Sequence, residues 1–333
     1  MIEASAPVRI CDNGGWTDTW FGGPGRVVNV AVIPGVEVSI RRTSGPDLVV
    51  LDVATFGARY PIVPGASRAA RHPLLEAAID ALPPPGSIAV EISVRSAIPA
   101  GSGTGTSAAV AVALLGALAA ARGEQCSRRH IAYAAHRLEV EGLRVESGIQ
   151  DQLSATFGGI NYLEIDPYPE ATVEPLPAWD ELGPRLTLVF LGMAHDSPAV
   201  HRQVIEDVGR HQSGALSQLR HAAVAARDAV IAQDLGAFGR AMIANTEAQK
   251  ALHPKLVGVD ATRVIAVAAG QRAVGWKVNG AGGDGGSVTI LSATPPDKQV
   301  LEGLVAGLDT RYQVLPIQVA TVGLQVRGEL GTP

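Results

Sequence analysis

The stretch that most constrains the fold of this chain is a glycine-rich loop, Ile98–Ala109, which runs directly into an apolar segment at 108–121. Three alternating glycines are followed by two hydroxyl residues: Gly101, Gly103, Gly105, Thr106 and Ser107. Glycine lets the backbone approach a ligand closely, and a helix that begins there offers unpaired N–H groups to an anion. The loop therefore predicts a nucleotide-phosphate site, though not a Walker A motif, because no lysine closes it. A simple bend with a helix cap at Thr104 or Thr106 is the alternative.

A second glycine-rich loop, Asn279–Gly286, has three glycines at the spacing of a dinucleotide fingerprint. That fingerprint requires a helix after the glycines, so that the pyrophosphate lies on its N-terminus. Here the segment 287–292 is strand-like, which excludes a Rossmann site. We expect the loop to pack closely against a ligand or another loop; a long hairpin without function is the alternative.

Composition bounds the class of protein. The chain has 333 residues, 47% of them hydrophobic and 18% charged, which predicts two folded domains. Its net charge is −5 and it has no basic block, so neither nucleic acid nor a membrane is an expected partner. Cys11 and Cys126 are expected to be free thiols. No signal peptide is visible, and the apolar run 108–121 is too short to span a membrane, so a cytoplasmic location is expected.

Hydrophobic periodicity predicts two α+β halves, each with one glycine-rich loop. In the first half, strands are expected at 5–11, 27–33, 36–42, 48–53, 88–94 and 160–165, and helices at 72–82, 108–121, 127–141 and 150–157. The proline-rich passage 166–184 predicts a linker between domains at 1–180 and 185–333. In the second half, strands are expected at 186–191, 274–278, 287–292 and 318–325, and helices at 198–208, 213–233, 235–252, 261–270 and 295–308.

Three segments, in order along nearly the whole chain, resemble the motifs of the GHMP kinases, the family that includes galactokinase, homoserine kinase and mevalonate kinase. They are Ala6–Asp18, Pro99–Ala109 and Lys277–Gly283. Two segments, Gly14–Thr19 and Ser147–Asn161, further resemble the branch that holds L-fucokinase and heptose 7-phosphate kinase.

The resemblance implies a two-domain α+β fold, with an N-terminal domain like ribosomal protein S5, a ferredoxin-like C-terminal domain and the nucleotide between them. It also implies transfer of the γ-phosphate of ATP to the anomeric (C1) hydroxyl of a sugar or sugar phosphate, with Mg²⁺ as cofactor. ATP and the sugar are then the partners, and a homodimer stays open. The alternatives are a non-catalytic sensor of nucleotide and sugar, and a kinase of the same fold that acts on a non-sugar alcohol.

The resemblance places the catalytic roles on Asp151 and Arg9. Asp151 would accept the proton of the sugar hydroxyl or orient it, and Arg9 would keep Asp151 ionised and stabilise the transferred phosphoryl group. Apart from the resemblance, Asp151 is a charge at a helix N-terminus and Arg9 a strand-end surface charge.

The second motif is expected to bind ATP through Pro99, Gly101, Ser102, Gly103, Thr104, Gly105, Thr106, Ser107 and Ala108. Magnesium keeps most of its waters, so few protein ligands are expected; the resemblance assigns them to Ser107 and Glu139, with Glu141 as a competitor. Thr104 and Thr106 replace the usual leucine and serine, and Thr106 keeps a hydroxyl.

Sugar contacts are expected from Gly15, Trp16, Thr17, Asp18, Gly159, Gly282, Gly283 and Asp284. Ordinary alternatives are a local turn for Thr17 and Asp18 and core packing for Trp16. Asp284 interrupts the third motif, and because a carboxylate repels a triphosphate, we expect it to face the sugar. Near the first C-terminal helix, His195, Asp196 and His201 are interpreted as part of a helix cap, with Asp196 or Ser197 before Pro198; a place in the lining of the substrate pocket is the alternative.

Overall fold

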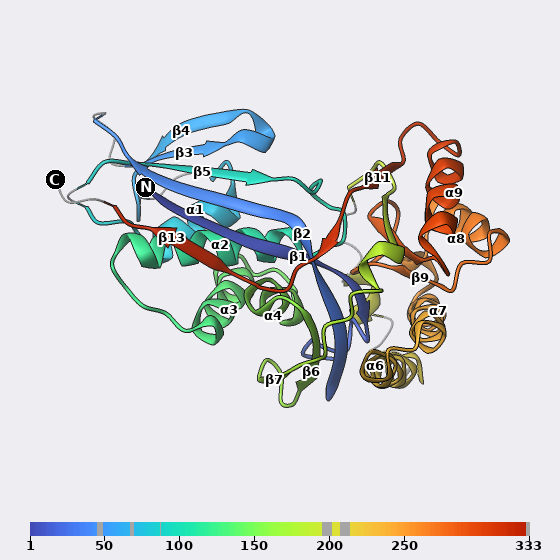
Figure 1. Cartoon of the computed structure of the whole chain (residues 1–333). Coiled ribbons are helices and arrows are strands. Elements are labelled where there is room, and N and C mark those ends of the chain that lie inside the picture. The colour runs from blue at the N-terminus through green and yellow to red at the C-terminus, as the bar shows by residue number, and fades with distance from the viewer. Residues whose placement is uncertain (45–48, 67–69, 87, 195–201, 207–213, 331–333) are drawn as a thin grey trace.

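The computed structural model describes residues 1–44, 49–66, 70–86, 88–194, 202–206 and 214–330. Two sheets organise these residues, one of nine strands and one of four. Figure 1 shows the two sheets beside each other, with helices α1 to α4 along one face of the larger sheet. In the described part of the chain, no helix is long and apolar enough to cross a membrane.

The larger sheet is built around β2 (Gly25–Arg42), a long strand whose neighbours are β1 (Ile2–Asn13), β5 (Val90–Ser96), and β6 (Ile160–Ile165). All three pair with β2 in the antiparallel direction. The sheet continues through β3 (Val49–Val53), parallel to β5, and β4 (Ala58–Ile62), and on the other side through β7 (Ala171–Pro175).

Helices α1 (Pro73–Ala81), α2 (Thr106–Ala121), α3 (Arg128–Arg137) and α4 (Gln150–Phe157) cover this sheet. The α2 helix is apolar on all sides because it lies in the core, where it packs against β1 and β2. A short π-helical turn, Leu138–Gly142, follows α3 directly.

The smaller sheet has the order β11 (Gln313–Leu315), β8 (Leu186–Phe190), β10 (Ser287–Leu291) and β9 (Gly275–Val278). The α8 helix (Val259–Gly270) and the α9 helix (Pro295–Ala306) pack against it. Two long helices lie at the junction of the sheets: α6 (Gly214–Ala232) contacts β2, and α7 (Leu235–Leu252) contacts β9. Single 3-10 turns occur at Ala54–Phe56, Gly183–Arg185 and Pro254–Leu256.

Most expected elements are confirmed, and α7 has the predicted bounds. The predicted break between 27–33 and 36–42 is wrong: both runs belong to β2, because its pairing with β1 resumes after the Pro34-Gly35 irregularity. The passage 166–184 is not a structureless linker, since β7 lies within it. Most of the expected helix 198–208 lies outside the described residues. Its described part, 202–206, is helical.

The last two described strands belong to the larger sheet. The expected strand 318–325 is replaced by two short strands, β12 (Gln318–Val319) on β2 and β13 (Gln325–Gly328) on β1. Residues 318–319 and 325–328 therefore complete the sheet of the first half. The division at 1–180 and 185–333 remains a prediction.

Candidate active site

The phosphate loop leads into α2 without a side-chain cap. Gly105 is the N-cap residue, with a φ of 70°, and it forms no side-chain cap hydrogen bond. Instead, the hydroxyls of the loop bind one another: Ser102 Oγ lies 2.7 Å from Thr104 Oγ1, which lies 3.2 Å from Thr106 Oγ1. The expected alternative, a cap by one of the threonines, is thus not formed. The first N–H groups of α2 have no side-chain acceptor, as an anion site requires.

A cavity of about 530 Å³ surrounds this loop. Most residues of the second motif line it, namely Gly101, Ser102, Gly103, Gly105, Thr106 and Ser107. Pro99, Thr104 and Ala108 do not line the cavity; Thr104 and Ala108 are buried. One part of the wall is apolar and includes Val53, Phe56, Leu74 and Val110. Another part carries the charged residues Arg9, Asp12, Asp18, Glu139 and Asp151.

Arg9 and Asp151 meet at the edge of the phosphate loop. Strand β1 supplies Arg9, and the first turn of α4 supplies Asp151, where the helix dipole favours a carboxylate. Arg9 Nε lies 2.8 Å from Asp151 Oδ1, and Arg9 Nη2 lies 3.1 Å from Oδ2. Arg9 Nη1 also donates to the carbonyl of Gly103. Burial opposes the charge of Arg9, but the carboxylates of Asp151, Asp12 and Asp18 raise its pKa above the ordinary value.

The first three residues of α4 reach three different partners. Asp151 binds Arg9, whereas the two glutamines beside it bind carboxylates from other segments. The Gln150 backbone N–H lies 3.2 Å from Asp18 Oδ2, and Gln152 Nε2 lies 2.7 Å from Glu139 Oε2. Neither glutamine is among the site residues predicted from the sequence. The Gln-Asp-Gln segment that contains them belongs to the stretch that resembles the L-fucokinase and heptose 7-phosphate kinase branch. The start of α4 therefore organises the charged wall.

Asp18 and Glu139 are buried carboxyl groups that face the same cavity. Burial, followed by repulsion from Asp151, raises the pKa of Asp18 to about 7. Burial also raises the pKa of Glu139 to about 7, against the effect of the Ser147 hydroxyl, whose Oγ donates to Glu139 Oε2 at 2.9 Å. Both groups therefore titrate near neutral pH.

The π-helical turn after α3 contains both candidate metal ligands, Glu139 and Glu141, and gives them different surroundings. Glu139 lies at the cavity wall within hydrogen-bond reach of Ser107, on the first turn of α2. Glu141 is exposed and does not line the cavity. In this π-helical turn, the Leu143 N–H bonds to the Leu138 carbonyl, so the register differs from that of an α-helix. The structure therefore brings Ser107 and Glu139 together.

Only two of the expected sugar-contact residues, Trp16 and Asp18, line the cavity. Trp16 is only 5% exposed and packs in a cluster with Val204, Leu216 and Leu219. The Thr17 hydroxyl instead donates to backbone carbonyls. The others that do not line it are Gly15, Gly159, Gly282, Gly283 and Asp284. His195, Asp196 and His201 lie outside the described residues.

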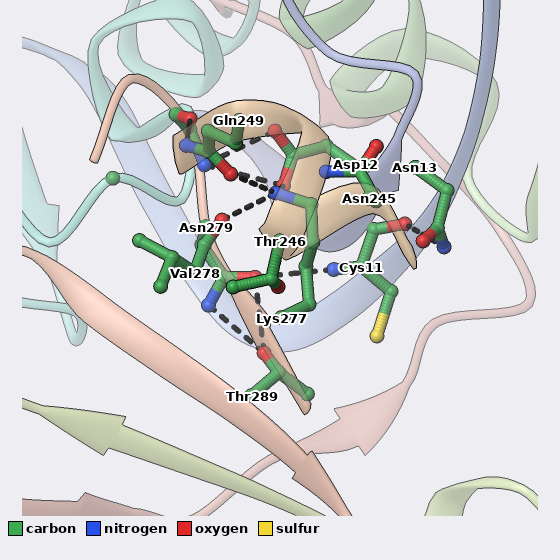
Figure 2. A network of polar contacts seen from close by, with 12 residues as sticks. Cys11, Asp12, Asn13, Asn245, Thr246, Gln249, Lys277, Val278, Asn279 and Thr289 are labelled. Atoms are coloured by element: carbon green, nitrogen blue, oxygen red, sulfur yellow. Dashed lines mark hydrogen bonds and ion pairs between the residues drawn. The ribbon is translucent and has the colours of Figure 1, made fainter. Parts of the chain in front are cut away.

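The loop between β9 and β10 explains part of this difference. The Gly283 N–H donates to the Leu256 carbonyl at 3.1 Å, so this half of the loop lies against the segment that follows α7. The other half reaches the cavity through Gly280 and Ala281. Figure 2 shows how Asn279 anchors the loop: its Nδ2 donates to Thr289 Oγ1 at 2.8 Å, and its Oδ1 accepts from the Cys11 N–H at 3.2 Å. As expected, a strand follows the glycines, which excludes a Rossmann site.

Comparisons with known proteins agree with this architecture. Residues 68–159 match the family model of the GHMP kinase N-terminal domain. The D-glycero-alpha-D-manno-heptose 7-phosphate kinase of Campylobacter jejuni is 26% identical over 203 residues, which is 60% of this chain and 60% of that protein.

Solved structures share the fold over almost the whole chain. A D-glycero-D-manno-heptose 1-phosphate kinase from Bacteroides thetaiotaomicron has a TM-score of 0.77 at 22% identity, covering 98% of this chain and 99% of that one. Lactococcus lactis galactokinase, solved with galactose, has a TM-score of 0.74 at 17% identity, covering 97% and 95%. Residues 68–159 thus match the N-terminal domain of the GHMP kinases, and the chain shares a two-domain α+β fold with these solved structures.

Proposed function

We propose that the chain is an ATP- and Mg²⁺-dependent kinase that phosphorylates the anomeric (C1) hydroxyl of a sugar or sugar phosphate. The observation that carries this proposal is the Asp151 carboxylate, held by Arg9 at the edge of an uncapped phosphate loop. The Campylobacter relative and the Bacteroides structure are both named as heptose phosphate kinases, which supports a sugar as acceptor.

In this proposal, Asp151 binds the hydroxyl of the acceptor and takes its proton at a carboxylate oxygen as the hydroxyl attacks the γ-phosphate. Arg9 fixes the direction of the Asp151 carboxylate through two hydrogen bonds and offers positive charge beside the phosphate loop. Transfer is direct, because positioning and charge stabilisation suffice for a phosphoryl group. The apolar wall at Val53, Phe56 and Leu74 suits the nucleotide base.

The oxygen donors at the cavity fit Mg²⁺. Ser107 and Glu139 are within hydrogen-bond reach of each other, and both side chains present oxygen, the ligand atom that Mg²⁺ prefers. Among the described residues, no three His, Cys, Asp or Glu side chains gather as a metal cage, so phosphate oxygens and waters would complete the shell. When bound, the ion would neutralise charge on the β- and γ-phosphates.

The test is ADP release from ATP and Mg²⁺ with a panel of acceptors: L-fucose, galactose, mannose, heptose 7-phosphate and uronic acids, with mevalonate and homoserine as non-sugar alcohols. A sugar acceptor and a product with phosphate on C1, identified by ³¹P NMR, are expected. Turnover with mevalonate or homoserine alone would reassign the acceptor. Binding of ADP without turnover on any acceptor would make the protein a sensor.

A further inference from the structure

Asp12 and Lys277 form an ion pair in the interior, where the end of β1 meets β9. Lys277 Nζ lies 3.3 Å from Asp12 Oδ1, and each side chain is only 1% exposed. Lys277 also donates to Gln249 Oε1 at 3.2 Å and to the Val278 carbonyl, as Figure 2 shows. A buried charge is tolerated when it is paired and hydrogen-bonded, and removing one member leaves the other uncompensated.

The same carboxylate holds the β9–β10 loop. The Gly280 N–H donates to Asp12, at 3.2 Å from Oδ1 and 3.1 Å from Oδ2, and the Gly280 carbonyl accepts from Gln249 Nε2 at 3.0 Å. Gly280 lies against the phosphate loop so closely that an added Cβ would be 2.6 Å from the Gly103 carbonyl oxygen. Asp12 therefore fixes the contact between the two glycine-rich loops.

The position of Asp12 carries an electrostatic problem. Asp12, Gly103 and Gly280 all line the cavity proposed for the nucleotide phosphates. A carboxylate there repels a triphosphate unless a cation cancels its charge. Arg9 forms its ion pair with Asp151, whereas Lys277 forms one with Asp12. Lys277 is therefore the cation that compensates the charge of Asp12.

We propose that Asp12 and Lys277 are a positioning pair for the nucleotide: Asp12 holds Gly280 against the phosphate loop, and Lys277 cancels the charge of Asp12. The inference rests on the proposed nucleotide site and adds two residues to it. Neither residue touches the reacting atoms; both act through the loop and through the charge at the cavity wall.

Three variants test the pair, with ADP binding measured by calorimetry at about pH 8 and thermal unfolding measured in parallel. Both Lys277→Met and Asp12→Asn should lower the melting temperature, because each leaves one buried charge unpaired. Their effects on ADP should be opposite in sign. Lys277→Met should weaken ADP binding about tenfold, because Asp12 is then uncompensated. Asp12→Asn should leave ADP affinity unchanged or raise it, since the variant removes a negative charge from the cavity wall and leaves the positive charge of Lys277 uncompensated behind it.

The double variant D12N/K277M should bind ADP within about threefold of the unmodified chain, because its pair is neutral and the amide oxygen introduced at position 12 can still accept from the Gly280 N–H. Lys298→Met, which removes a lysine of the α9 surface, is the matched control and should change neither quantity.

If Lys277→Met does not fold, the ADP affinity of the double variant tests the proposal. A folded double variant that binds ADP more than tenfold weaker overturns the pair, as does a parallel loss of affinity in both single variants. If the unmodified chain fails to bind ADP, the proposed nucleotide site itself falls.

Discussion

Arg9 and Asp151 lie 142 residues apart in the sequence and form a two-point ion pair at 2.8 and 3.1 Å. The two side chains differ in exposure: Arg9 is 5% exposed and Asp151 is 25% exposed. The guanidinium thus holds the carboxylate from within the protein while part of the carboxylate remains open at the cavity wall. A carboxylate that is fixed in direction and still accessible is the arrangement a proton-accepting group needs.

Asp151→Asn should lower kcat about 1,000-fold, because the amide cannot take the proton of the hydroxyl. ADP affinity, measured by calorimetry, should stay within about threefold, because the phosphate loop is unchanged. Asp297→Asn is a matched control, since Asp297 also lies in the first turn of a helix but on the surface of α9. Turnover within tenfold of the unmodified chain would remove Asp151 from the proposed mechanism.

Glu139→Gln should raise the Mg²⁺ concentration that half-saturates ADP binding by about tenfold, because an amide oxygen is a weaker ligand for this ion than a carboxylate. Glu141→Gln is the control: this neighbour is exposed and away from the cavity, so its Mg²⁺ dependence should be unchanged. Titration of Mn²⁺ by electron paramagnetic resonance in the presence of ADP measures the same quantity without turnover. Equal behaviour of the two variants would contradict the assignment of Glu139.

Tyr168→Phe should weaken Mg²⁺ binding through Ser147. The His136 ring nitrogen Nε2 lies 2.8 Å from the Tyr168 hydroxyl, which donates to the Ser147 carbonyl at 2.8 Å. Since the Ser147 side chain binds Glu139, losing one hydrogen bond should raise the Mg²⁺ requirement about fivefold, with the KM for the sugar unchanged.

Tyr133→Phe is the control for this chain of hydrogen bonds, which runs from His136 through Tyr168 to Ser147. Its hydroxyl accepts from the Ala171 N–H at 2.9 Å, outside the cavity, so it should affect stability alone. This chain of hydrogen bonds has no role in metal binding if the two tyrosine variants show the same Mn²⁺ affinity.

The pH dependence of activity and of stability should have opposite signs. Asp18 has a pKa of about 7, raised from 3.8 chiefly by burial, so its ionised form is lost as pH falls below neutrality. If ionised Asp18 binds the sugar, kcat/KM should rise with pH through about 7. The folded chain binds this proton more tightly than the unfolded chain, so the free energy of unfolding should decrease as pH rises between these two pKa values.

Asp18→Asn should remove this part of the slope, as measured by urea unfolding at about pH 5 and about pH 8. The variant should also raise the KM for the sugar while leaving ADP affinity unchanged. An identical pH slope of stability in both proteins would show that Asp18 does not titrate in this range.

The elements with strong local signals were predictable. The helix after the phosphate loop follows from glycines before a long apolar run, and α7 follows from its periodicity. The exclusion of a Rossmann site also needed only local sequence, because the residues after the loop are β-formers. Short strands such as β4, β7 and β11 were missed, because they have only three to five residues and β4 and β7 also contain proline and charged residues, so their alternation is weak.

By itself, the sequence determined the loop chemistry: alternating glycines with following hydroxyls, and the order of the three motifs. Only the tertiary structure decided which charges meet. It placed Glu139 at the cavity wall and Glu141 and Asp284 away from it, and it paired Asp12 with Lys277 across two sheets. The physical reason is that backbone conformation depends largely on neighbours in sequence, whereas burial, charge pairing and pKa depend on what the fold packs around each group.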